Sequence, residues 1–95
     1  MIRLSLRIGH PAGIHARIAA RAVLRASRFS SSVFIRTSRG TASLTRLADL
    51  LGLDVNHGET VELLADGPDE AEALTDIGAF LRAEPDPTNP RRTLT

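Results

Sequence analysis

The sequence contains no cysteine, no tryptophan, no tyrosine and no lysine. Without cysteine, the chain cannot form a disulfide framework, a thiolate metal site or a cysteine nucleophile. With only three phenylalanines, it offers few rings for stacking on bases, which argues against a nucleic-acid binder. No apolar run approaches the ~18 residues of a transmembrane helix, and residues 1–10 alternate in character unlike a signal peptide. We therefore expect a cytoplasmic protein without membrane insertion.

Acidic residues are missing from the first half of the chain. Residues 1–48 hold nine arginines and no acid, whereas residues 49–95 hold all eleven acids and three arginines. The halves therefore carry formal charges of +9 and −8, although the whole chain carries only +1. Such a chain could present a basic face to an anionic partner, including a nucleic acid. It could equally fold so that the halves interleave and their charges pair, and the residues alone leave both alternatives open.

Hydrophobic periodicity predicts seven regular elements. The expected strands are residues 2–8, 33–37, 41–44 and 60–65, and the expected helices are residues 16–28, 47–52 and 68–81. The order β-α-β-β-α-β-α is typical of an α+β domain with helices on one face of an antiparallel sheet. We expect this domain over residues 1–84. Residues 85–95 contain three prolines and almost nothing apolar, so we expect a disordered tail there.

The stretch Gly13-Ile14-His15-Ala16-Arg17 joins a glycine-containing loop to the first turn of a predicted helix. Free backbone N–H groups and the positive end of the helix dipole stabilise an anion at such a position. Arg17 could donate two parallel hydrogen bonds to phosphate oxygens, and a neutral His15 could attack a phosphoryl group. The alternatives are an ordinary surface histidine and a site that binds anions without chemistry, and spacing alone does not separate them.

In this strand–loop–helix setting, residues 13–17 resemble the active-site signature of the HPr family. These proteins are the histidine-containing phosphocarriers of the bacterial phosphoenolpyruvate-dependent phosphotransferase system. The resemblance runs from Ile2 to about Ala83 and includes the element order, the leucines of the helix at 47–53 and the Gly58-Glu59 turn. It implies an open-faced β-sandwich, in which three helices cover one face of a four-stranded antiparallel sheet.

The resemblance also implies a function. His15 would accept a phosphoryl group on Nδ1 from phosphorylated enzyme I and pass it to an EIIA-type protein, while Ala16 and Arg17 would bind the phosphate. No cofactor and no metal would be needed, and the carrier would be a monomer. The implied docking surface consists of Ala16, Ala20, Leu24, Leu47, Ala48 and Leu51, fringed by Arg21 and Arg46. Ordinary core packing is the alternative for Leu47 and Leu50.

Two positions depart from the family pattern. Ile18 replaces the proline that usually follows the arginine, which leaves an additional N–H and a less rigid first turn. Arg46 stands where many members carry a regulatory serine at the start of the second helix, with Thr45 as a candidate N-cap beside it. Arginine cannot be phosphorylated by a serine kinase, so we expect no such regulation. The departures leave open a regulatory binding module with weak or no phosphoryl transfer.

His10 and His57 are the other histidines. His10 is close to the signature in sequence and could lie beside the phosphate, whereas His57, in Asn-His-Gly, is expected in a turn. Three scattered histidines without helical spacing or a carboxylate set are a poor metal signature. A chain of this length also has little room for a hydrolase cleft.

Overall fold

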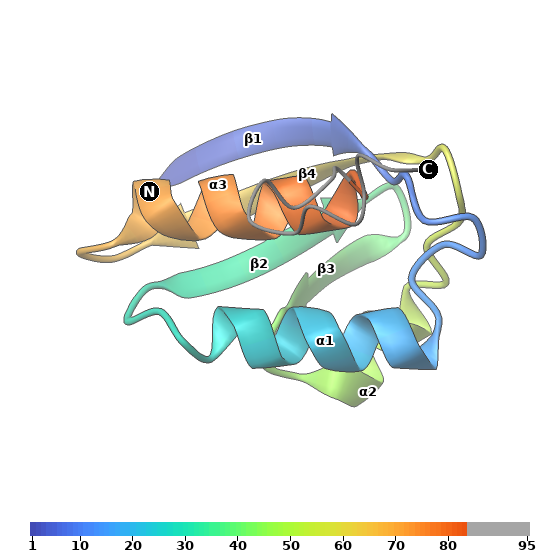
Figure 1. Ribbon diagram of the computed structural model, residues 1–95, viewed down its shortest axis with the longest axis horizontal. Coiled ribbons are helices and arrows are strands. Elements are labelled where there is room, and N and C mark those ends of the chain that lie inside the picture. The colour runs from blue at the N-terminus through green and yellow to red at the C-terminus, as the bar shows by residue number, and fades with distance from the viewer. Residues whose placement is uncertain (84–95) are drawn as a thin grey trace, which may run out of the picture.

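The computed structural model describes residues 1–83, so the predicted disordered tail at 85–95 lies outside the described residues. The seven elements follow the predicted order (Figure 1). Their bounds are β1 Ile2–Arg7, α1 Ala16–Ala26, β2 Ser32–Thr37, β3 Gly40–Ser43, α2 Leu47–Gly52, β4 Thr60–Asp66 and α3 Glu70–Leu81.

The four strands form one antiparallel sheet in the order β1-β4-β2-β3. Successive residues of a strand point to opposite faces, and the register places Leu6 opposite Val61 and Ile35 opposite Leu63. All four of these side chains are buried. Figure 1 shows α1 and α3 lying over one face of the sheet, with α2 beside α1. The predicted open-faced α+β sandwich is confirmed.

The core fills the space between this face and the helices. The largest fully buried side chains are Ile8, Val33, Ile35, Leu44, Leu50, Leu63, Ile77 and Leu81. Burying each of these contributes roughly 1.5–3 kcal/mol. Gly78 lets α3 approach β1 closely, because a Cβ at this position would lie 2.9 Å from Cδ2 of Leu4. Gly78 lies among the buried residues of α3.

Several boundaries differ from the predicted ones. The first helix ends at Ala26, two residues early, because the N–H of Arg28 turns back to the carbonyl of Arg25. The last helix begins at Glu70 rather than at residue 68. The N-cap of α2 is Arg46, so Thr45 as N-cap was wrong. Thr45 instead belongs to a turn in which its N–H donates to Oγ of Ser43 at 3.2 Å.

The two oppositely charged halves interleave in the fold. Arg25 pairs with Asp76 between α1 and α3, and Glu62 of β4 pairs with Arg36 and, at 3.7 Å, with Arg3. Each of these pairs joins an arginine of the first half to an acid of the second. Two arginines of α1, Arg17 and Arg21, make no ion pair within residues 1–83, and neither does Arg28, which follows the helix. Charge pairing thus offsets part of the charge difference between the two halves of the chain, and it leaves a basic surface on α1.

None of the helices described between residues 1 and 83 is both long and apolar enough to span a membrane.

Candidate functional site

The loop between β1 and α1 is fixed to its surroundings at both ends. At its start, the N–H of Gly9 donates to the carbonyl of Leu81 at 3.0 Å, and a Cβ on Gly9 would lie 2.0 Å from the carbonyl oxygen of Arg82. At its end, Gly13 has a φ of +72°, and a Cβ there would lie 2.3 Å from the carbonyl oxygen of Val55. Only glycine fits such approaches without displacing backbone. The loop therefore has little freedom where it enters the helix.

The segment that holds the end of the loop is itself anchored. The N–H of buried Ile14 donates to the carbonyl of Val55 at 2.9 Å. Glu59 closes this segment by accepting from the N–H of Asn56 at 3.1 Å and from Arg39. Burial acts to raise the pKa of Glu59, but these hydrogen bonds and the charge of Arg39 outweigh it, so the pKa is lowered. Glu59 remains ionised at neutral pH and keeps Val55 in place for Ile14.

His15 lies at the N-cap of α1. Its backbone is extended, with φ −86° and ψ −178°, and its exposed side chain makes no capping hydrogen bond. The first hydrogen bond of the helix runs from the N–H of Ala19 to the carbonyl of His15 at 2.8 Å. The N–H groups of Ala16, Arg17 and Ile18 precede it and therefore have no acceptor in the helix. An imidazole and three backbone donors thus occur together at the positive end of the helix dipole.

The exposed side chains of the implied docking surface lie next to this site. Leu24, Leu47 and Leu51 are 63%, 41% and 37% exposed, and Ala16, Ala20 and Ala48 are exposed as well. They belong to α1 and α2, which pack side by side (Figure 1). Core packing holds for Leu50, which is fully buried, but not for Leu47. We define these six exposed residues as the α1–α2 patch. Exposed Arg17 and Arg21 belong to α1, exposed Arg46 is the N-cap of α2, and exposed Arg28 follows the C-cap of α1.

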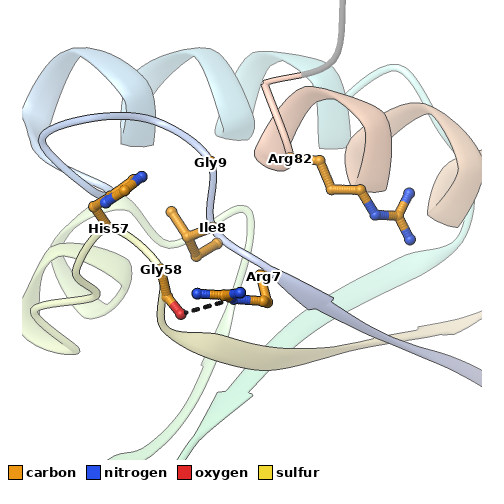
Figure 2. Close-up of a pocket in the computed structure, with 6 residues that line it drawn as sticks. All are labelled: Arg7, Ile8, Gly9, His57, Gly58 and Arg82. Atoms are coloured by element: carbon orange, nitrogen blue, oxygen red, sulfur yellow. Dashed lines mark hydrogen bonds between the residues drawn. The ribbon is translucent and has the colours of Figure 1, made fainter.

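The other two histidines lie in different surroundings. Nε2 of His10 is 2.7 Å from the carbonyl oxygen of Phe80, which places this ring against the end of α3. His57 lies in a turn, as predicted. It lines a shallow pocket of ≈ 580 Å³ together with Arg7, Ile8, Gly9, Gly58 and Arg82. Figure 2 shows that the basic groups do not converge there, because Arg7 lies along the Gly58 carbonyl and Arg82 points away from His57.

Sequence reasoning did not find two supports of the site, Gly9 and Val55. A signal existed for Gly9, because glycines at both ends of a short loop indicate close backbone approaches. Val55 acts through its carbonyl, and no side-chain pattern identifies such a role. Within residues 1–83, no group of three or more histidine, aspartate or glutamate side chains is arranged to hold a metal ion.

Comparison with known proteins places this geometry in a family. The family model described as the PTS HPr component phosphorylation site matches residues 2–83. The HPr-like protein Crh of Bacillus subtilis is 33% identical over 84 residues, covering 88% of this chain and 99% of Crh. The phosphocarrier protein HPr of Mycoplasma genitalium is 36% identical over 75 residues, covering 78% of this chain and 85% of that protein.

Solved structures agree with the sequence matches. The crystal structure of HPr-C-His from Thermoanaerobacter tengcongensis superposes with a TM-score of 0.82 at 30% identity, over 87% of this chain and 93% of that one. The crystal structure of Bacillus subtilis Crh, a dimer with a swapped domain, gives a TM-score of 0.73 at 32% identity, over 90% and 99% of the two chains. The match along almost the whole folded region, together with an exposed histidine at the start of α1, means that the chain belongs to the HPr family of phosphocarrier proteins of the phosphotransferase system.

Proposed function

We propose that the protein accepts a phosphoryl group on His15 from phosphorylated enzyme I and passes it to an EIIA-type protein. The observation that carries this proposal is the exposed, uncapped imidazole of His15 beside three backbone N–H groups without helical acceptors. A neutral imidazole nitrogen is a competent nucleophile toward phosphorus, and N–H groups at a helix start bind phosphate oxygens.

The transfer conserves bonds and charge. A bond forms between phosphorus and Nδ1 of His15 while the bond between phosphorus and the donor group of enzyme I breaks. The N–H groups of Ala16 and Arg17 donate hydrogen bonds to the phosphoryl oxygens, and the Arg17 guanidinium, which has no ion pair within residues 1–83, balances their charge. The reverse sequence on a second partner releases the group.

The same α1–α2 patch would dock both partners in turn. Its leucines supply apolar area and the arginines of α1 supply positive charge, which suits acidic partner surfaces and rapid association. Because α1 carries both His15 and part of the patch, docking brings the donor group to the ring.

The test is phosphorylation with purified components. The protein is incubated with phosphoenolpyruvate and enzyme I, and intact-mass spectrometry follows the gain of one acid-labile phosphoryl group. We expect the gain in the wild type and its absence in His15→Ala. His57→Ala is the matched control, because it removes another exposed histidine and is expected to gain the group normally. A phosphoryl gain by His15→Ala would overturn the assignment of the acceptor.

A second candidate function is a regulatory binding module with slow or no transfer. The similarity to Crh, described as HPr-like, and the replacements at Ile18 and Arg46 favour it. This function predicts partner complexes of equal affinity with the wild type and with His15→Ala, in the absence of phosphoryl donor. A large loss of affinity in His15→Ala would contradict it.

We also propose that the carrier acts as a monomer, since one chain contains the loop, the helix start and the α1–α2 patch. A swapped dimer is known for Crh. Light scattering after size exclusion, at micromolar concentration, distinguishes the two states.

A further inference from the structure

The imidazole of His10 connects the loop that carries His15 to the carboxyl end of α3. Its Nε2 lies 2.7 Å from the carbonyl oxygen of Phe80, and the two rings are tilted by 54° with centroids 5.1 Å apart. A carbonyl oxygen only accepts hydrogen bonds, so Nε2 must carry the proton and donate it. The side chain is partly buried. His10 thus makes a defined bond to a residue 70 positions away in the chain.

Phe80 offers a fixed attachment point, because its ring contacts Arg25 of α1, the helix whose N-cap is His15. The Arg25 guanidinium of α1 lies 4.8 Å from the centroid of the Phe80 ring. Arg25 also pairs with Asp76, one turn before Phe80 on α3. A cation over an aromatic face and an ion pair on the same arginine restrain the ring relative to α1. The loop attached to Phe80 is therefore positioned relative to α1 as well.

His10 also organises the loop through its backbone. Its carbonyl accepts a hydrogen bond from the N–H of Gly13 at 2.9 Å, which closes the turn over Pro11 and Ala12. Pro11 and Ala12 are exposed. The His10 side chain thus adds a contact to Phe80 within the loop, between the backbone bonds at Gly9 and at Ile14.

We propose that His10 is a positioning residue, whose imidazole holds the loop so that His15 is presented in one orientation for phosphoryl transfer. The inference rests on the proposed function. A displaced reacting group can slow a reaction by up to about 100-fold even when binding is intact. Removing the His10 ring should therefore lower the maximal transfer rate. It should leave the concentration of enzyme I at half-saturation unchanged, because the α1–α2 patch is not altered.

The experiment measures single-turnover transfer from phosphorylated enzyme I to wild type, His10→Ala, His10→Gln and His57→Ala. Glutamine can place its own Nε2 near the position of the imidazole nitrogen and donate to the Phe80 carbonyl. We expect the maximal rate of His10→Ala to fall about 10-fold or more, with half-saturation within about twofold of wild type. We expect His10→Gln to recover most of the rate and His57→Ala to match the wild type. Circular dichroism confirms that each variant is folded at the assay temperature, and His10→Gln decides the matter if His10→Ala does not fold.

Nuclear magnetic resonance tests the same idea without any transfer. Long-range ¹⁵N–¹H spectra of wild type should show the Nε2–H form of His10, and ¹⁵N relaxation should show greater motion of residues 10–15 in His10→Ala. A His10→Ala rate equal to wild type, a His10→Gln rate as low as that of His10→Ala, or an unchanged loop would overturn the inference. If the wild type itself accepts no phosphoryl group, the proposed function fails, while the relaxation data still decide whether His10 holds the loop.

Discussion

At the scale of single residues, Ile18 shows how one substitution changes two properties of the site. Its side chain is only 4% exposed and belongs to the core cluster, while its N–H is one of the three donors at the start of α1. The sequence alone suggested only a looser first turn here. The structure shows that isoleucine at this position also packs against the interior, which a proline ring fills less completely.

We predict that Ile18→Ala lowers the free energy of unfolding by about 2–5 kcal/mol, the range for truncating a buried isoleucine. For Ile18→Pro we expect a smaller loss, of about 1 kcal/mol, because the rigid ring restores part of the stability through the unfolded chain. For a domain of this size, 1 kcal/mol corresponds to about 4–8 °C in Tm. Thermal unfolding measures the stability of both variants. Thr41→Ala, a substitution at an exposed position of β3, is the control. A proline variant more stable than wild type would contradict the packing role.

At the scale of elements, the junction between β2 and α3 depends on one carboxylate. Asp69 precedes α3 but makes no side-chain cap there. It accepts hydrogen bonds from the N–H groups of Ser30 and Ser31, at 2.9 and 2.8 Å, and from the Ser31 hydroxyl. The Ser31 hydroxyl is the main cause of a lowered pKa of Asp69, followed by the Ser30 N–H. The loop before β2 is therefore fastened to the start of α3.

We predict that Asp69→Asn destabilises the fold more at neutral pH than in acid. The pKa of Asp69 is lower in the folded chain than in the unfolded one, so its stabilising effect is present above the unfolded value of about 3.9. It is lost as the pH falls through the lower folded value. Urea unfolding at a series of pH values from 7 downward should show a difference from wild type that is constant near neutrality and shrinks steadily once the pH falls below about 4. Glu72→Gln, an exposed carboxylate on the same helix, is the control, and a difference that persists unchanged in acid would refute the prediction.

Elements were predictable from sequence where local periodicity determines them, and their ends were not. The alternation in β1 and β4 and the leucine spacing in α2 are local patterns, so their positions were predicted correctly to within a residue or two. The end contacts depend on partners far away in the chain. Asp69 reaches Ser31 across 38 residues and His10 reaches Phe80 across 70. The signature around His15 could be predicted from the sequence because it is also a local pattern. Its loop glycine and the start of the helix lie within five residues of each other.

At the scale of the whole molecule, pairing between the halves offsets part of the positive charge of the first half. Arg3 and Arg36 are matched by Glu62 on the sheet, and Arg25 by Asp76. Charge pairing therefore does not oppose the idea of a basic docking face. It leaves positive charge on and just after α1, where Arg17, Arg21 and Arg28 make no ion pair within residues 1–83.

We predict that Arg21→Glu slows association with enzyme I much more than Arg3→Glu, although both change the net charge by two units. Arg21 is exposed on α1, beside the α1–α2 patch, whereas Arg3 lies on the strand β1 and pairs with Glu62. Electrostatic steering depends on the local potential near the contact and weakens with salt. The difference between the two association rates should therefore be largest at low ionic strength. It should shrink near 0.5 M salt, where the screening length is only about 4 Å. Stopped-flow or surface-based association rates at several salt concentrations measure it. Equal slowing by both substitutions would mean that only net charge matters, and docking through α1 would then lose its electrostatic support.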